Sequence, residues 1–231
     1  GTRQIDSLQP FHFVDEVHAV FLSGGSAFGL DASGGVAQFL EEKSIGYQTS
    51  AGKVPIVPTA IIYDLGLGEG KVRPDKKMGF QACANAQSGP VAEGSVGAGT
   101  GASVGKLYGI RNANKGGGGT TSLISPSVAI VGALVVVNAF GDVVEPQNRK
   151  ILAGARDPQN PDRFIDSAAM IKKGASMPGW NTGFQNTTLG VIATNVKLSK
   201  RQIIKVAQMA QSGLVRTISQ IHSTVDGDLV F

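Results

Sequence analysis

The segment GFQNTTLGVIATN, residues 183–195, places an amide and two hydroxyls side by side, where a glycine-containing loop meets an alternating apolar run. Three interpretations of Asn186, Thr187 and Thr188 are open. Asn and Thr form turns through local side-chain hydrogen bonds, and Asn-Thr-Thr also fits the N-x-[ST] glycosylation pattern. The third interpretation is cleavage of the chain before Thr187, which would make its hydroxyl the nucleophile of a new N-terminus.

A hydroxyl nucleophile needs a base, and the histidines of this chain offer little support for one. His12, His18 and His222 lack acidic or cysteine partners at ligand spacing, so we expect structural or surface roles for them and no metal site. Ser-His-Asp catalysis is also poorly supported. An N-terminal threonine would supply its own base, because a free α-amine has an unperturbed pKa of about 7.7–8.0.

The glycine-rich segments fail as nucleotide-binding motifs, so we expect no cofactor. GASVGK (101–106) lacks the Walker spacing, and GAGTGA (97–102) fits G-x-G-x-x-A without clearly following a strand. KGGGGTT (115–121) is interpreted as a flexible turn. SGGSAFG (23–29) lacks the last Gly of a nucleophile elbow, so Ser26 is interpreted as a helix start whose neighbouring amides could hold an anion.

The composition is that of a globular protein and argues against several partner classes. Of 231 residues, 42% are apolar and 16% are charged, which is enough to bury a core. The net charge of +4 comes without a long basic run, so nucleic acid is not an expected partner. A membrane is not expected either, because no apolar run reaches the roughly 18 residues that a span requires. The single cysteine, Cys83, fits a reducing compartment, so we expect a cytoplasmic location, with the periplasm left open.

The hydrophobic pattern alternates strands and helices without a repeat or a linker, as in one α/β or α+β domain of stacked layers. Strands are expected over residues 17–23, 54–65, 187–196 and 226–231, with a hairpin within 127–146 that turns at Gly141 and Asp142. Helices are expected up to about Gly46, over 78–88 and after the capping residue Ser199. Residues 93–109 should cross between elements, and residues 145–185 are interpreted as a long loop.

Seven segments that together span nearly the whole chain are similar to those of a known family. They are GTRQID, VHAVFLSGGSAFGLDASGGV, VPIVPTAIIYDLG, GSVGAGTGASVGK, VGALVVVNAFGDV, NTTLGVIATN and HSTVDGDLVF. In this order they resemble the P1 family of peptidases, the group of the L-aminopeptidase/D-amidase-esterases, the β-aminopeptidases and the nylon-oligomer hydrolase. The resemblance implies a four-layer α-β-β-α sandwich and a precursor that cuts itself before a Ser or Thr. Family members usually carry further segments at both ends, so residues 1–231 are expected to form a single hydrolase domain that is truncated at both ends.

By this resemblance the nucleophile is Thr187 and the cut bond is Asn186–Thr187, which would divide the chain into residues 1–186 and 187–231. Asn138 matches the family asparagine near the nucleophile, where its amide could donate to an oxyanion; a strand-end turn residue is the alternative. Lys106 matches a lysine near the catalytic centre of the nylon-oligomer hydrolase. It could keep the α-amine neutral or stabilise developing negative charge, or it could be an ordinary solvated lysine.

Three further residues carry over from the same hydrolase. Asp226 and Asp228 match its acidic pair and could bind or orient the amine of Thr187, or hold a substrate ammonium. The alternative is a hairpin turn, since Asp-Gly is common there. Tyr63 falls where that hydrolase has an active-site tyrosine, whose phenol could donate to an oxyanion, although an aromatic residue on a strand more often belongs to the core.

The resemblance implies a self-processing amidohydrolase or aminopeptidase that works through an acyl-enzyme on Thr187. Three alternatives stay open: an acyltransferase of the ornithine-acetyltransferase type, a hydrolase of aminohexanoate oligomers, and a non-catalytic binding protein on the same scaffold. The expected partners are a small peptide or amide with a free amine, and further copies of the chain in a homo-oligomer of cleaved protomers. Replacing Asn138 with Ala should slow acylation without unfolding the protein.

Overall fold

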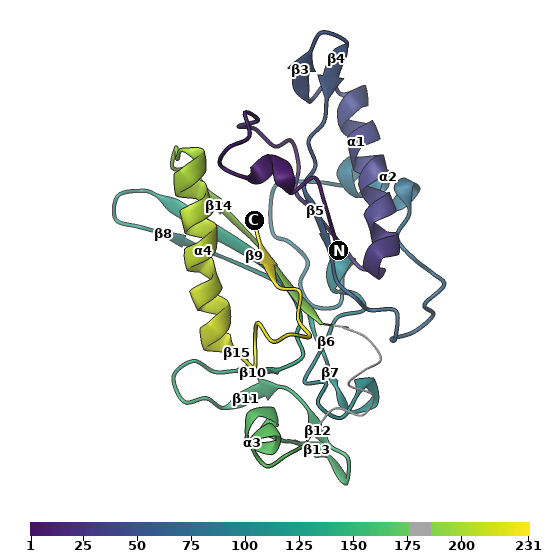
Figure 1. Ribbon diagram of the computed structural model, residues 1–231, viewed down its shortest axis with the longest axis vertical. Coiled ribbons are helices and arrows are strands. Elements are labelled where there is room, and N and C mark those ends of the chain that lie inside the picture. Colours follow the sequence, from purple (N-terminus) through teal and green to yellow (C-terminus); the bar gives the residue numbers. More distant parts are fainter. Residues whose placement is uncertain (176–185) are drawn as a thin grey trace.

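The chain folds into four stacked layers, in which two helical layers enclose two β-sheets (Figure 1). The computed structural model describes residues 1–175 and 186–231. One sheet has the strand order β1-β5-β2 and the other has the order β16-β14-β9-β8. The two sheets pack face to face through Ala60 of β5 and Ile62 just after it on one side, and through Val136 and Leu189 on the other. The four-layer sandwich expected from the sequence is therefore confirmed.

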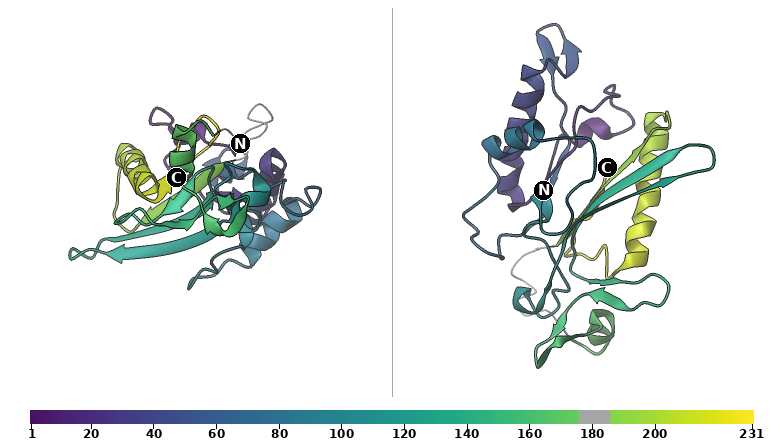
Figure 2. Two further views of the ribbon diagram at one scale, coloured as in Figure 1. Left: turned by 90° about the horizontal axis from the view of Figure 1, so that it is seen from below. Right: turned by 180° about the vertical axis from the view of Figure 1, so that it is seen from behind.

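The first sheet consists of β1 (Thr2–Arg3), β5 (Thr59–Ile61) and β2 (Phe21–Ser23). Its outer face is covered by α1 (Ser33–Glu42) and α2 (Lys76–Ala84), as the views in Figure 2 show. Val36 and Leu40 of α1 pack against Val57, just before β5. A short 3-10 helix, η2 (Ser26–Ala32), joins β2 to α1, so the predicted helix is entered through a tighter turn.

The second sheet is built from β8 (Gly117–Ile124), β9 (Ile130–Asn138), β14 (Thr187–Thr194) and β16 (Leu229–Val230). Along β9, Leu134 and Val136 pack toward the first sheet, whereas Val135 and Val137 pack toward the helix on the other face. Because successive side chains of a strand point to opposite faces, a strand covered on both sides must be apolar at every position. This explains the uninterrupted apolar run that made β9 easy to predict.

Helix α4 (Lys200–Thr217) covers the outer face of the second sheet (Figure 1). Ser199 and Gln202 form a complete capping box at its start, which confirms the predicted cap. Lys200, the first helical residue, donates from Nζ to the carbonyls of Ser7, His12 and Val14 at 2.8–2.9 Å and so ties the N-terminal loop to this helix.

The remaining elements are short and gather mainly at one end of the sandwich, below the sheets in Figure 1. A three-stranded sheet has the order β11-β10-β15. The strands not yet given are β3 (Tyr47–Thr49), β4 (Gly52–Val54), β6 (Ser103–Val104), β7 (Asn114–Lys115), β10 (Asp142–Val144), β11 (Ile151–Ala153), β12 (Arg156–Asp157), β13 (Asn160–Phe164) and β15 (Ile218–Ser219). The remaining helices are α3 (Ser167–Lys172) and the 3-10 helices η1 (Asp6–Leu8), η3 (Gly97–Gly99) and η4 (Ile110–Asn112). No helix in residues 1–175 or 186–231 is both long and apolar enough to cross a lipid bilayer.

The predicted hairpin at Gly141 and Asp142 is wrong. Strand β9 pairs with β8 and β14, whereas β10 leaves that sheet and pairs with β11 and β15. A side chain at Gly141 would have its Cβ 1.5 Å from the carbonyl oxygen of Ser219, so this glycine permits close backbone contact with a distant segment rather than a local reversal.

Two loop predictions are also wrong. The segment KGGGGTT does not form a flexible turn, because Gly117 to Thr121 lie in β8 and pair with β9. Within the expected loop of residues 145–185, the structure has β11, β12, β13 and α3. The part of that loop from 176 to 185 lies outside the described residues.

Candidate active site

Thr187 is the first residue of β14 and lies opposite Asn138, the last residue of β9, in the antiparallel register. Thr187 is 8% exposed and Asn138 is fully buried. The two residues meet where the central strands of the second sheet end, close to the turn that carries Asp226 (Figure 1). Asn186, one residue before the strand, forms an isolated parallel bridge with Asp226.

The carbonyl oxygen of Asn186 receives two hydrogen bonds. The Oγ1 hydroxyl of Thr187 donates to it at 2.5 Å, and the backbone N–H of Gly227 donates to it at 3.0 Å. The Gly227 N–H draws electron density from the carbonyl carbon and would stabilise negative charge on that oxygen as the hydroxyl attacks. The hydroxyl of Thr187 therefore lies beside a polarised carbonyl, at the bond where cleavage is expected.

The buried side chains around this bond disfavour the two simpler interpretations of the Asn-Thr-Thr stretch. Asn186 is 5% exposed, and its Nδ2 donates to the carbonyl of Val225 at 3.2 Å, so its amide is not presented for glycosylation. Within the described part of the chain, Asn186 Oδ1 and Thr188 Oγ1 are buried without hydrogen-bond partners. They do not make the local hydrogen bonds through which Asn and Thr shape turns.

Lys106 and Asn138 form one buried polar unit. Lys106 Nζ donates to both the backbone oxygen and Oδ1 of Asn138, each at 2.9 Å. Asn138 Oδ1 also accepts from Ser103 N at 3.0 Å, while its Nδ2 donates to the backbone oxygen of Tyr63 at 2.9 Å. Asn138 thus joins β9 to two other segments, and its position does not depend on a turn.

Burial gives Lys106 an unusual protonation equilibrium. Its side chain lies in the interior, with the residue only 5% exposed. Loss of hydration disfavours the ammonium form and lowers the pKa of Lys106 to about 7, although the carboxylates of Asp226 and Asp64 oppose this by favouring the charge. A lysine of this kind is not a solvated surface residue, and it can exchange a proton near neutral pH.

Asp226 and Asp228 lie on either side of the Gly227 amide and accept hydrogen bonds from the chain itself. Asp226 accepts from Phe140 N at 3.2 Å and from the hydroxyl of Ser223. Burial raises the pKa of the Asp226 carboxyl, while these hydrogen bonds oppose the rise. Asp228 accepts from the amide of Thr188 at 2.6 Å, which fixes it next to the residue that follows the nucleophile.

His222 belongs to this cluster, although its sequence context did not indicate it. Its Nδ1 lies 2.9 Å from Asp228 Oδ2, and its backbone N–H donates to the same oxygen at 3.1 Å. The Asp228 side chain is 2% exposed, whereas that of His222 is 39% exposed. In the sequence, the only indication of this pair is the spacing of six residues between His222 and Asp228, and that spacing matches no standard metal-ligand or catalytic-triad pattern.

Tyr63 joins the site through its backbone, since its carbonyl accepts from Asn138. Tyr63 lines a narrow pocket together with Asp64, Ser103 and Lys106. In the described part of the chain, its phenol makes no hydrogen bond to Thr187. The structure therefore brings Thr187, Asn138, Lys106, Asp226 and Asp228 together and places Tyr63 at their border.

Asp64 is a second residue that the sequence did not single out. Its Oδ1 accepts from the backbone N–H of Gly25 at 2.7 Å, in the glycine turn that follows β2. The amides next to Ser26 were expected to hold an anion, and the anion present there is this carboxylate of the chain itself. Ser26 begins the 3-10 helix η2, and its own N–H donates to the carbonyl of Ile62.

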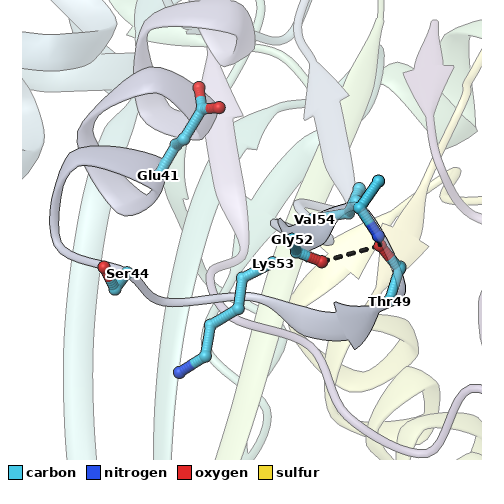
Figure 3. Close-up of a pocket in the computed structure, with 7 residues that line it drawn as sticks. Glu41, Ser44, Thr49, Gly52, Lys53 and Val54 are labelled. Atoms are coloured by element: carbon cyan, nitrogen blue, oxygen red, sulfur yellow. Dashed lines mark hydrogen bonds between the residues drawn. The ribbon is translucent and has the colours of Figure 1, made fainter.

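Other possible sites offer less chemistry. A wider hollow lies between the end of α1 and the β3–β4 hairpin and is lined by Glu41, Ser44, Thr49 and Lys53 among others (Figure 3). None of the predicted site residues lines it. Among residues 1–175 and 186–231, no three His, Cys, Asp or Glu side chains are grouped so that they could hold a metal ion.

The sequence of this chain is similar to those of known hydrolases. The profile of peptidase family S58 matches residues 1–231. A relative from Mycobacterium leprae, named an uncharacterized aminopeptidase, is 42% identical and is matched over 100% of this chain and 63% of its own length. A 6-aminohexanoate-oligomer endohydrolase from Agromyces sp. is 32% identical, over 93% of this chain and 59% of its own. The chain thus spans less than two thirds of the length of either relative.

Solved structures share the fold. A β-aminopeptidase from Burkholderia sp. superposes with a TM-score of 0.54 at 25% identity, covering 90% of this chain and 50% of that one. The L-aminopeptidase D-Ala-esterase/amidase of Ochrobactrum anthropi, described as a variant of the Ntn hydrolase fold, superposes with a TM-score of 0.59 at 20% identity. That match covers 87% of this chain and 49% of the other.

Proposed function

Because this chain belongs to peptidase family S58, we propose that the protein hydrolyses amide bonds with Thr187 as its nucleophile, after cutting its own chain at Asn186–Thr187. The observation that carries the proposal is the pair of donors on the Asn186 carbonyl, one of which is the hydroxyl that would attack. The relatives named aminopeptidase and 6-aminohexanoate-oligomer endohydrolase support an amide as the substrate.

Self-cleavage begins when Thr187 Oγ1 attacks the carbonyl carbon of Asn186. The Gly227 amide, 3.0 Å from the carbonyl oxygen, stabilises the negative charge that develops there. The C–N bond then breaks, the hydroxyl proton passes to the departing nitrogen, and an ester joins Asn186 to the Thr187 side chain. Water opens this ester, which leaves a carboxylate on Asn186 and a free α-amine on Thr187.

Substrate hydrolysis uses the same hydroxyl with a new base. The α-amine of Thr187 takes the hydroxyl proton as Oγ1 attacks the substrate carbonyl, and it then passes that proton to the leaving amine. In this proposal the amine is oriented by Asp228, which accepts from the amide of Thr188, and by Asp226, which is bridged to Asn186. Water releases the acyl group from the ester and regenerates the enzyme.

Lys106 and Asn138 supply positive charge and hydrogen bonding next to the nucleophile. Asn138 is the register partner of Thr187 and is itself bound by Lys106 Nζ. With a pKa of about 7, Lys106 can be either an ammonium that stabilises an oxyanion or a neutral amine that leaves the Thr187 amine unprotonated. Tyr63 borders the same pocket, where its phenol could contact an acyl group.

The substrate we propose is a small peptide or amide with a free amino group, and aminohexanoate oligomers are one candidate class. The active form is proposed to be a homo-oligomer of cleaved protomers. A cytoplasmic location is also part of the proposal, based on the single free cysteine, Cys83.

The test is an assay of full-length protein on α-peptides, β-peptides, amino-acid amides and aminohexanoate oligomers, with intact mass measured during turnover. We expect free acid as the product and an acyl adduct on the fragment that begins with Thr187. Preferential transfer of the acyl group to an added primary amine would assign the acyltransferase activity instead. Absence of both turnover and adduct would leave a binding protein and overturn the proposal.

A further inference from the structure

Asp64 lies two residues after Ile62 of the buried core and directly after Tyr63, at the border of the site described above. One of its carboxylate oxygens, Oδ1, is held by the backbone N–H of Gly25 at 2.7 Å. Gly25 has a φ of +83°, a conformation that favours glycine, so the turn that presents this amide depends on its residue type. The carboxylate is thereby oriented by a rigid backbone group.

Two glycines pack on the other carboxylate oxygen. A Cβ atom added to Gly24 or to Gly101 would lie 2.4 Å from Asp64 Oδ2 in either case. These two glycines are almost eighty positions apart in the sequence. Because neither has a side chain, the backbone of each packs directly on the same carboxylate. A side chain at either position would displace Asp64, so the fold leaves space for this acid in one orientation.

Asp64 borders the narrow pocket beside the reaction centre. Asp64 lines this pocket with Tyr63, Ser103 and Lys106. Lys106 is one residue removed from the nucleophile. Its Nζ donates to Asn138, and Asn138 is the register partner of Thr187 on the neighbouring strand. Burial lowers the pKa of Lys106, and the Asp64 carboxylate partly opposes this by favouring the ammonium form.

The other acids of the site have less capacity for a ligand. Asp226 accepts from Phe140 N and from the Ser223 hydroxyl and amide, and Asp228 accepts from Thr188 N and from His222. In the described part of the chain, the Asp64 carboxylate accepts a hydrogen bond from Gly25 alone. Among the carboxylate oxygens of these three acids, Asp64 Oδ2 is the one that accepts no hydrogen bond from the described residues.

We propose that Asp64 is the specificity residue that binds the ammonium group of the substrate, in the pocket it shares with Tyr63 and Lys106. This inference rests on the proposed amide hydrolysis and transfers amine recognition from the pair Asp226 and Asp228 to Asp64. Asp226 and Asp228 then keep a single role, which is to orient the α-amine of Thr187. An ammonium group placed on Oδ2 would make a charge-assisted hydrogen bond, which discriminates strongly against an uncharged group of the same size.

The test compares full-length wild type, Asp64→Asn and the exposed control Asp31→Asn on two substrates. Alanine p-nitroanilide carries the ammonium group, and propionyl p-nitroanilide differs only by lacking it. Asn keeps an oxygen for the Gly25 amide but removes the charge. In Asp64→Asn we expect kcat/KM for the ammonium substrate to fall about 10- to 100-fold, mainly through KM. The des-amino substrate shares only the change in the Lys106 pKa, so its kcat/KM should fall much less than that of the ammonium substrate, and self-cleavage should remain complete.

Equal losses on both substrates would make Asp64 a positioning residue and overturn the inference, as would no loss on either. A wild type that hydrolyses both substrates equally well also overturns it while leaving the proposed function intact. A wild type that hydrolyses no amide at all contradicts the proposed function itself. If Asp64→Asn does not cut itself, propylammonium provides a second readout: it should inhibit the wild type competitively where propanol does not, and no inhibition overturns the inference.

Discussion

Thr187 and Asn138 face each other as the last register pair of β14 and β9. One residue starts its strand and the other ends its strand, so the two residues lie side by side at one end of the central strands. Asn138 is fully buried and carries hydrogen bonds to Lys106, Ser103 and Tyr63. The nucleophile is thus positioned against a polar unit that is itself part of the core.

This relationship changes the expected effect of Asn138→Ala. Acyl-enzyme formation should slow by about 10²–10³-fold, the usual loss for one oxyanion donor. From the sequence alone we expected the fold to tolerate this change, but its burial now predicts lower stability. Each buried partner left without its hydrogen bond costs about 1–3 kcal/mol. Chemical unfolding together with single-turnover kinetics measures both effects, and the exposed Asn195→Ala serves as the control; an unchanged unfolding midpoint would contradict the burial argument.

Gly227→Ala tests the surroundings of the cleaved bond. The backbone donor to Asn186 remains, but the added methyl would lie 3.2 Å from Thr187 Oγ1 and crowd the attacking hydroxyl. We expect self-cleavage to slow by about 10-fold or more, because small displacements of reacting atoms are costly. The matched control is Gly213→Ala in α4, where a Cβ would meet no atom within 4 Å. The rate of self-cleavage is measured by a time course on a denaturing gel. Equal cleavage rates in Gly227→Ala and Gly213→Ala would contradict the close approach of residue 227 to Thr187 Oγ1.

Lys106 predicts a pH dependence of stability. Its folded pKa of about 7 lies below the ordinary value of 10.5, so between these values the unfolded chain binds a proton that the native protein does not. The free energy of unfolding should therefore rise with pH from about 7 to about 10, and this contribution should be lost as pH falls through 7. Lys106→Met should remove that rise, whereas the exposed Lys53→Met should retain it. Urea unfolding at pH 6, 7, 8 and 9 measures it; identical slopes in wild type and Lys106→Met would contradict the low pKa.

Local sequence signals predicted the elements that depend on local chemistry. Helix α4 begins with a capping box at Ser199, which is visible within four residues. In β14, apolar residues alternate along the strand. In β9, the apolar run is continuous because both faces of the strand are buried. The four-layer arrangement came from the resemblance of seven segments to a family rather than from these patterns.

The errors fall where an element depends on a pairing or packing partner that the local residue types do not reveal. Gly117 to Gly119 favour a turn by residue type, but they form a strand because β9 supplies their pairing. Asp142 and Val143 pair with Ser219 and Ile218, a contact that no local pattern could indicate. For the same reason Asp64 escaped notice, since the glycines that enclose its carboxylate lie about forty positions before it and after it.

The central claim is that Thr187 cuts the chain and then attacks substrate, and one experiment tests both steps. Full-length wild type, Thr187→Ala, Thr187→Ser and Thr188→Ala are compared by denaturing gel, intact mass and N-terminal sequencing of the smaller fragment. We predict a fragment that begins at Thr187 in the wild type and in Thr188→Ala, partial cleavage in Thr187→Ser, and one uncut, inactive chain in Thr187→Ala. A smaller fragment that begins at any other residue, or full amidase activity in Thr187→Ala, would contradict the account.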